Sequence, residues 1–124
     1  MAPLIQVALG GALGASARYL SGVGMTHLFG KSFPWNTMFV NFLGSFLMGV
    51  LVVVLAHENG NRFAPLLMTG LLGGFTTYSA FSLDTMTIFE RGDYGIAAAY
   101  VIGTLFLALG GIALGLYSAR SFYA

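Results

Sequence analysis

The chain has 124 residues, of which 57% are hydrophobic and only 7% are charged, and its formal net charge is +1. A soluble domain carries roughly 25% charged residues, so we expect this chain to be an integral membrane protein. Nucleic-acid binding needs a clustered basic face, which the small net charge argues against. The chain has no cysteine, which excludes disulfides and thiolate metal sites.

Four hydrophobic runs follow one another and predict a single all-α domain over residues 1–124. The runs cover residues of about 3–25, 36–57, 62–88 and 94–120. Because about 20 helical residues cross a hydrocarbon core roughly 30 Å thick, each run is long enough to span a membrane. The first run lacks a basic start and is too long for a cleaved signal peptide, so we expect it to be the first spanning helix. With four spans, both termini lie on one side.

The connecting loops give almost no orientation signal. Arg62 and Arg120 lie on the side of the termini, and Lys31 and Arg91 lie on the other side, to which Arg18 adds at most one charge. Orientation normally follows an excess of Lys and Arg in cytoplasmic loops. The balance favours dual topology, with copies inserted both ways and an antiparallel homodimer as the working unit; the alternative is that a small chain simply has few charges. The chain shows no internal repeat, so two-fold symmetry needs a second copy.

Polar residues line one face of the second run. Thr37, Asn41 and Ser45 are spaced four residues apart, so they share one helix face. The amide of Asn41 brings two N–H donors and each hydroxyl brings one, a set suited to an anion stripped of water. The alternative is hydrogen bonding between helices. We favour that alternative for Ser45 and a functional role for Asn41.

The stretch GGFTTYSAFS at residues 73–82 interrupts the third run with a glycine pair and hydroxyls. Non-helical backbone at membrane depth is tolerated only against protein or a wet cavity, so we expect the third helix to be broken near Gly73–Thr77, with the two glycines forming the break. Freed carbonyls suit a hard monovalent cation such as Na⁺. The positive ring edges of Tyr78 and Phe81 suit a small anion, with ordinary aromatic packing as the alternative.

Three further side chains lie at or near membrane depth. Arg18 is the only cation inside the first run; either its side chain snorkels to the interface, or it attracts anions in a vestibule. Asp84 ends the polar stretch of the third run, where we expect a solvated helix end. Thr104 would extend the hydroxyl line from Asn41. Glycines spaced four or five residues apart predict close helix packing: Gly10 and Gly14, Gly44 and Gly49, Gly70 and Gly74, and Gly111 and Gly115.

Three stretches, GGALGASARY (10–19), NTMFVNFLGSFLMG (36–49) and GLLGGFTTYSAFS (70–82), resemble the signatures of the CrcB/Fluc fluoride channels. The resemblance implies a fluoride-specific channel in the inner membrane of a prokaryote that lets cytoplasmic fluoride leave down its gradient. It also implies an antiparallel dual-topology dimer with two pores, each lined by both subunits, and a central Na⁺.

The resemblance also implies roles for individual residues. Asn41 would be the pore asparagine, Tyr78 and Phe81 the rings that flank fluoride, and Arg18 the arginine of the first helix. Thr37 and Thr104 would belong to a polar track. We place six side chains on the fluoride pathway: Asn41, Tyr78, Phe81, Thr37, Thr104 and Ser82. The backbone carbonyls of Gly73 and Thr76 would ligate the Na⁺.

The chain departs from the family pattern at four positions. Tyr78 stands where phenylalanine is usual, Asn36 where glycine is common, Ala80 where threonine is common, and Ala108 where a hydroxyl is expected.

Two other functions stay open. A small dual-topology multidrug or cation transporter calls for a membrane-embedded carboxylate, and the first run has none. A non-transporting membrane assembly subunit would use the polar residues only to join helices. We do not expect an enzyme, because the sequence offers no Ser/His/Asp set and no paired carboxylates at membrane depth.

Overall fold

The computed structural model describes residues 2–124, and these residues form helices and the loops between them. The elements are α1 (Pro3–Phe29), α2 (Trp35–His57), η1 (Asn61–Phe63), η2 (Pro65–Leu72), α3 (Gly73–Phe75), α4 (Tyr78–Glu90) and α5 (Tyr94–Tyr123). The four predicted runs correspond to α1, to α2, to the stretch from η1 to α4, and to α5. The all-α prediction is therefore confirmed, and each run lies within a few residues of the observed bounds.

Proline and glycine explain where the long helices begin and end. Pro3 is the first residue of α1, where its fixed φ and missing N–H are favourable. Gly30 ends α1 with a φ of 78°, and its N–H donates to the Thr26 carbonyl at 2.8 Å. Gly92 has a φ of 86° in the turn between α4 and α5. Both positive φ angles are unfavourable for a side chain with a Cβ, so glycine suits these turns.

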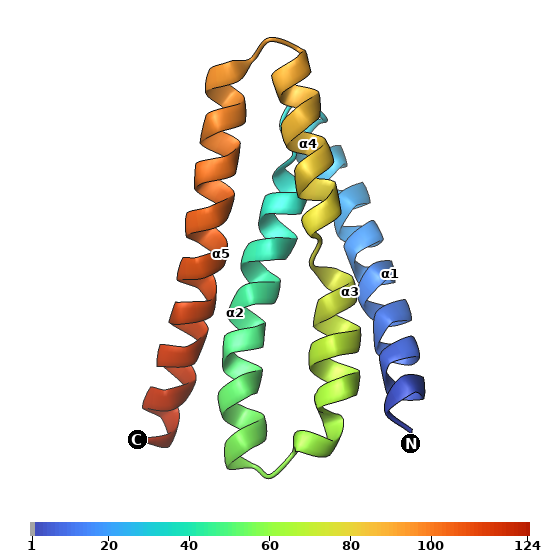
Figure 1. The fold of residues 1–124 in the computed structure, drawn as a ribbon, viewed down its shortest axis with the longest axis vertical. Coiled ribbons are helices and arrows are strands. Elements are labelled where there is room, and N and C mark those ends of the chain that lie inside the picture. Colours follow the sequence, from blue (N-terminus) through green and yellow to red (C-terminus); the bar gives the residue numbers. More distant parts are fainter. Residues whose placement is uncertain (1) are drawn as a thin grey trace.

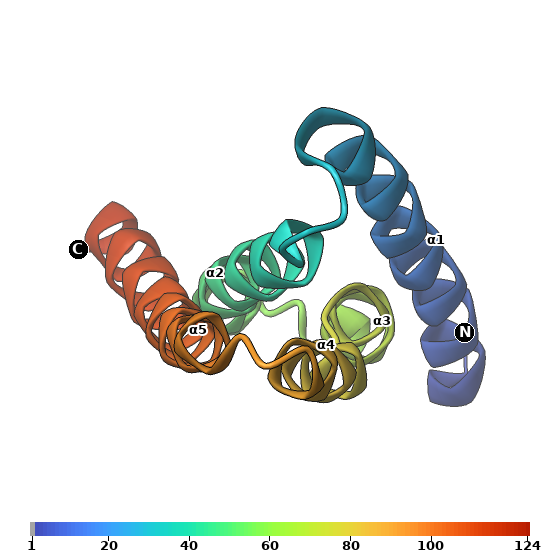
Figure 2. The ribbon, with the colours of Figure 1, turned by 90° about the horizontal axis from the view of Figure 1, so that it is seen from above.

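The helices form an open arrangement in which α1 and α5 lie at opposite edges (Figures 1 and 2). Between them, α2 packs on α5, and η2 and α3 pack on α1. Both termini lie at the same end of the molecule, as predicted (Figure 1).

Three segments are long and apolar enough to cross a membrane: residues 35–57, 61–90 and 94–123. The chain is therefore a multi-pass membrane protein. Helix α1, with 27 residues, has the length of a span. Helix α1 is less apolar than these three segments, because it contains several glycines together with Gln6 and Arg18. That α1 forms a fourth span stays a prediction.

Glycines allow the close helix contacts that the sequence predicts. A Cβ on Gly10 would lie 2.7 Å from the Leu71 nitrogen and 2.9 Å from the Gly70 Cα, so α1 touches the backbone of η2. A Cβ on Gly49 of α2 would lie 2.9 Å from the Leu116 nitrogen of α5. Backbone contacts of this kind also occur at Gly14, Gly70, Gly74, Gly111 and Gly115, whereas a Cβ on Gly44 would meet the side chains of Thr76 and Phe75.

The third run is broken, but not at the glycine pair. Gly73 and Gly74 are helical, and the extended residues are Thr76 (φ −85°, ψ 158°) and Thr77 (φ −151°, ψ 123°), between α3 and α4. The break thus lies at the C-terminal end of the predicted range, and the prediction that the glycines form it was wrong. Gly74 has a packing role instead, because a Cβ there would lie 2.8 Å from the Gly11 carbonyl oxygen of α1. The π-helical turns of η2 were not predicted.

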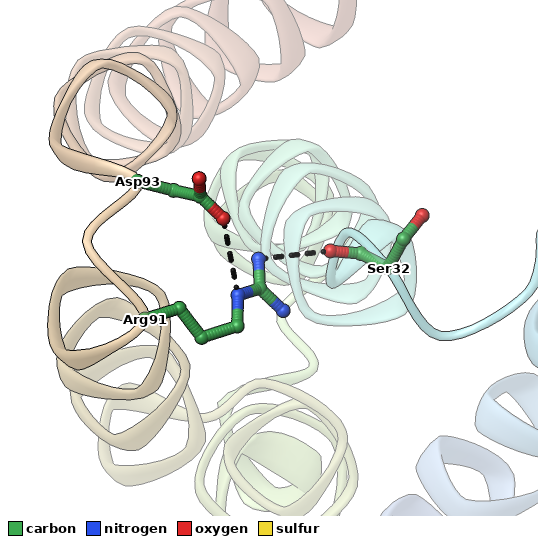
Figure 3. A network of polar contacts seen from close by, with 3 residues as sticks. All are labelled: Ser32, Arg91 and Asp93. Atoms are coloured by element: carbon green, nitrogen blue, oxygen red, sulfur yellow. Dashed lines mark hydrogen bonds and ion pairs between the residues drawn. The ribbon is translucent and has the colours of Figure 1, made fainter.

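At the end of the molecule opposite the termini, Arg91 joins two loops (Figures 1 and 3). Its Nε donates to an Asp93 carboxylate oxygen at 3.2 Å, and a terminal guanidinium nitrogen donates to the Ser32 carbonyl at 3.3 Å. These bonds connect the α4–α5 turn to the loop between α1 and α2. Because both side chains of the Arg91–Asp93 ion pair are nearly half exposed, this pair contributes little to stability.

Candidate functional site

The helix break receives hydrogen bonds from a neighbouring helix. The Thr77 N–H donates to Asn41 Oδ1 of α2 at 2.8 Å, and Asn41 Nδ2 donates to the Thr77 carbonyl at 3.0 Å. The Thr77 hydroxyl oxygen accepts from the Ala80 N–H at 3.1 Å and so caps the start of α4. One amide and one hydroxyl therefore satisfy backbone groups that the break would otherwise leave without partners.

Arg18 of α1 supports the same break from the other side. Its Nε donates to the Gly74 carbonyl at 3.1 Å, an oxygen that a continuous helix would pair with the N–H of residue 78. The side chain also lines a vestibule of about 860 Å³ with Tyr19 and His27 of α1 and with Asn36 of α2. The role of Arg18 as a vestibule charge stays a prediction.

Two carbonyls that the sequence singled out are left free by these bonds. In a continuous helix, the N–H of Thr77 and the N–H of Ala80 would bond to the carbonyls of Gly73 and Thr76. Both N–H groups bond elsewhere, and within residues 2–124 neither carbonyl accepts a hydrogen bond. Backbone carbonyls are good ligands for hard cations.

Four of the six predicted pathway side chains line one cavity of about 490 Å³: Asn41, Tyr78, Phe81 and Thr104. The hydroxyl of Thr104, a residue only 6% exposed, has no hydrogen-bond partner there. The rings of Tyr78 and Phe81 meet edge to face, with centroids 5.9 Å apart. Tyr78 is nonetheless 82% exposed, so the cavity opens to the surface of the single chain.

The walls of this cavity carry no charged side chain. Amide, hydroxyl and aromatic groups line it together with apolar residues. Such groups offer N–H and O–H donors and positive ring edges to an anion. A fixed cation would hold the ion instead of letting it pass. The lining therefore offers donors to a small anion without a fixed charge to trap it.

The other two predicted pathway residues lie elsewhere. Thr37 lines the vestibule, and its hydroxyl donates to an Asp84 carboxylate oxygen at 2.7 Å. Ser82 is exposed, and its hydroxyl donates to the Tyr78 carbonyl of its own helix at 3.1 Å. The place of Ser82 on a pathway stays a prediction.

Asp84 is not the solvated helix end that we expected. The same carboxylate oxygen that accepts from Thr37 also accepts from the fully buried Tyr100 hydroxyl at 3.0 Å. Tyr100 further packs edge to face on Phe33 and lies 5.4 Å, ring to ring, from Phe81. The sequence did not predict this cluster of Thr37, Asp84 and Tyr100, because its three members come from α2, α4 and α5.

No cluster of three or more His, Asp or Glu side chains occurs in the described part of the chain.

Comparisons with known proteins agree on one family. Residues 5–116 match the family model described as CrcB-like protein, Camphor Resistance (CrcB). A protein of Cereibacter sphaeroides named fluoride-specific ion channel FluC is 64% identical over 121 residues, which are 98% of this chain and 97% of that protein. Proteins with the same name from Ruegeria sp. and Agrobacterium fabrum are 52% and 43% identical, over 94% and 99% of this chain and 94% and 100% of their own lengths. The chain belongs to the CrcB/Fluc family.

Proposed function

We propose that this chain is a fluoride-selective channel that lets cytoplasmic fluoride leave down its gradient across the inner membrane of a prokaryote. The observation that carries the proposal is the uncharged cavity in which Asn41, Tyr78, Phe81 and Thr104 meet. An ion pathway must replace the hydration shell of the ion without trapping it, and amide, hydroxyl and ring-edge groups suit a small anion. The names of the bacterial relatives support fluoride as that anion.

The working unit that we propose is an antiparallel dual-topology homodimer with two pores, each lined by both copies. The balanced Lys and Arg content of the two ends supports insertion in both orientations. The exposure of Tyr78 (82%) and Leu105 (55%) on the cavity wall supports a missing second wall. A second copy would close the cavity and remove the Tyr78 ring from lipid.

A central structural Na⁺, held by the carbonyls of Gly73 and Thr76, is part of the proposal. These oxygens fit a hard monovalent cation because neither of them accepts a hydrogen bond from any group within residues 2–124. Bound there, Na⁺ supplies a positive charge that neutralises carbonyl ends at membrane depth. The second copy would complete the coordination shell.

The two other functions are less consistent with the structure. A cation transporter needs a carboxylate that is free to bind its substrate or a proton, but Asp84 already accepts from Thr37 and Tyr100. An assembly subunit would use its polar groups between its own helices. Thr104 lines the cavity, and its buried hydroxyl has no such partner.

Efflux from liposomes that contain the purified protein tests the proposal. We expect rapid fluoride loss, measured with a fluoride electrode, and negligible chloride loss. Phe81→Ile should slow fluoride efflux, whereas Phe89→Ile, eight residues further along the same helix and outside the cavity, should not. A protein that passes no fluoride in any lipid would sink the proposal, and unchanged efflux in Phe81→Ile would remove that ring from the pathway.

Dual topology has its own test. A cysteine introduced by Asn61→Cys, in the exposed η1 turn, should be labelled in cells from both sides of the membrane. Labelling from one side alone would rule out insertion of this chain in both orientations.

A further inference from the structure

We propose that Asn41 is a positioning residue for the helix break. It holds Thr77 in its extended conformation and thereby fixes the carbonyls of Gly73 and Thr76 relative to the rings that follow the break. The roles of those carbonyls and rings rest on the proposed function, whereas the positioning of Thr77 by Asn41 does not.

The two hydrogen bonds show why an asparagine suits this position. In an extended residue, the N–H and the C=O point to the same side, as they do in antiparallel pairing between strands. A single carboxamide offers an acceptor and a donor side by side, and Asn41 uses both on Thr77, at 2.8 and 3.0 Å. Because both bonds go to one residue, they restrain its orientation as well as its position.

These bonds leave Asn41 little capacity for an anion. Its Oδ1 accepts from Thr77, and one of its two amide hydrogens donates to Thr77. At most one N–H is left for an ion in the cavity that Asn41 lines. The side chain therefore acts mainly on the protein backbone.

The consequences extend to both sides of the break. On the N-terminal side, the Gly73 carbonyl is free because the Thr77 N–H donates to Asn41 instead. On the C-terminal side, α4 begins at Tyr78, directly after Thr77, whose hydroxyl oxygen caps the helix. A displaced Thr77 would move the first turn of α4 and restore the helical partner of the Gly73 carbonyl. One side chain thus links the candidate cation site to the candidate anion path.

Hydrogen–deuterium exchange of the purified protein, followed by mass spectrometry of peptides across residues 73–82, tests the positioning directly. Asn41→Ala removes the acceptor for the Thr77 N–H, and we expect its exchange to become about tenfold faster, the scale set by losing one hydrogen bond. Asn41→Asp keeps an acceptor but loses the donor to the Thr77 carbonyl, so this amide should stay protected. Ser45→Ala, one turn away on the same helix face, should leave exchange unchanged. Equal exchange in Asn41→Ala and the natural chain would overturn the proposal.

The link to the cation site is tested by fluoride efflux from liposomes over a series of Na⁺ concentrations. In Asn41→Ala, the Na⁺ concentration that gives half-maximal efflux should rise several-fold, whereas Phe89→Ile, outside the cavity, should match the natural chain. A residue that only touched the anion would slow efflux at every Na⁺ concentration alike, and that result would overturn the link. If the natural chain passes no fluoride, the proposed function fails, but the exchange measurement still decides whether Asn41 positions Thr77.

Discussion

The contact between α1 and η2 gives a sharp test, because two adjacent glycines of α1 have opposite surroundings. The three atoms nearest to a Cβ on Gly10 would all be backbone atoms: the Leu66 carbonyl oxygen, the Leu71 nitrogen at 2.7 Å and the Gly70 Cα at 2.9 Å. A Cβ on Gly11 would meet nothing within 4 Å. Gly10→Ala and Gly11→Ala therefore add the same methyl group to the same helix, one into contact and one into open space.

The expected free energies follow from two opposing effects. Alanine is favoured over glycine inside a helix by up to about 1 kcal/mol, and this gain applies to both variants. Overpacking typically costs about 1–3 kcal/mol and sometimes more. At Gly10 the nearest atoms are backbone atoms, which cannot rotate away, so α1 must shift from η2. We expect an overpacking cost above this range. After the helix-propensity gain is subtracted, Gly10→Ala should be about 2 kcal/mol less stable than the natural chain. That loss lowers the folding equilibrium constant about 30-fold.

Unfolding in mixed detergent micelles, followed by helical circular dichroism at fixed protein concentration, measures both variants. Gly11→Ala should unfold at the same denaturant concentration as the natural chain or at a higher one, and Gly10→Ala at a lower one. If both variants shift equally, or if Gly10→Ala is as stable as Gly11→Ala, the close contact between α1 and η2 is not formed as described.

Three further predictions concern single interactions. Thr77→Val removes the cap of the Ala80 N–H at 3.1 Å and should cost about 1 kcal/mol of unfolding free energy, whereas Thr77→Ser should retain most of it. Asp84→Ala removes the acceptor of two hydroxyl bonds, at 2.7 and 3.0 Å; we expect an unfolding loss of about 2–4 kcal/mol, and a loss below 1 kcal/mol would contradict the buried cluster. Asp93→Asn weakens the exposed pair with Arg91, so the free energy of unfolding in the same assay should change by less than about 1 kcal/mol. A larger change would show that the loops depend on this pair.

The helices were predictable because their signals are local. Pro3 and the hydrophobic runs locate the beginning of α1 and the spans, and Gly30 and Gly92 accompany the turns with positive φ. The glycine pairs predicted close packing, since small residues are what two helix backbones need in order to touch. Each of these signals lies within a few residues of the feature that it predicts.

The position of the break depends on partners that are distant in sequence. Gly73 and Gly74 suggested a break because glycine weakens a helix, yet packing on α1 explains Gly74 and keeps that turn helical. Of the two extended residues, Thr77 is hydrogen-bonded by Asn41, 36 positions earlier. In the same way, Asp84 finds a partner in Thr37, 47 positions away. Local composition shows that such residues are polar but not which groups they satisfy.

The break also explains why activity alone cannot assign roles to the polar residues of this chain. The sequence predicts Arg18 as a vestibule charge and Asn41 as a pathway residue, and each donates a hydrogen bond to a backbone carbonyl at the break. A substitution at either position would alter the backbone that forms the route and any direct contact with the ion at the same time. A lower fluoride flux would be the expected result in both cases. The two roles differ in what else a substitution changes. Losing a positioning residue also changes backbone exchange at residues 73–82 and the Na⁺ dependence of efflux, whereas losing a direct contact with the ion changes neither. Thr104, whose buried hydroxyl has no protein partner, is the position where a loss of flux without those changes would identify a direct ligand.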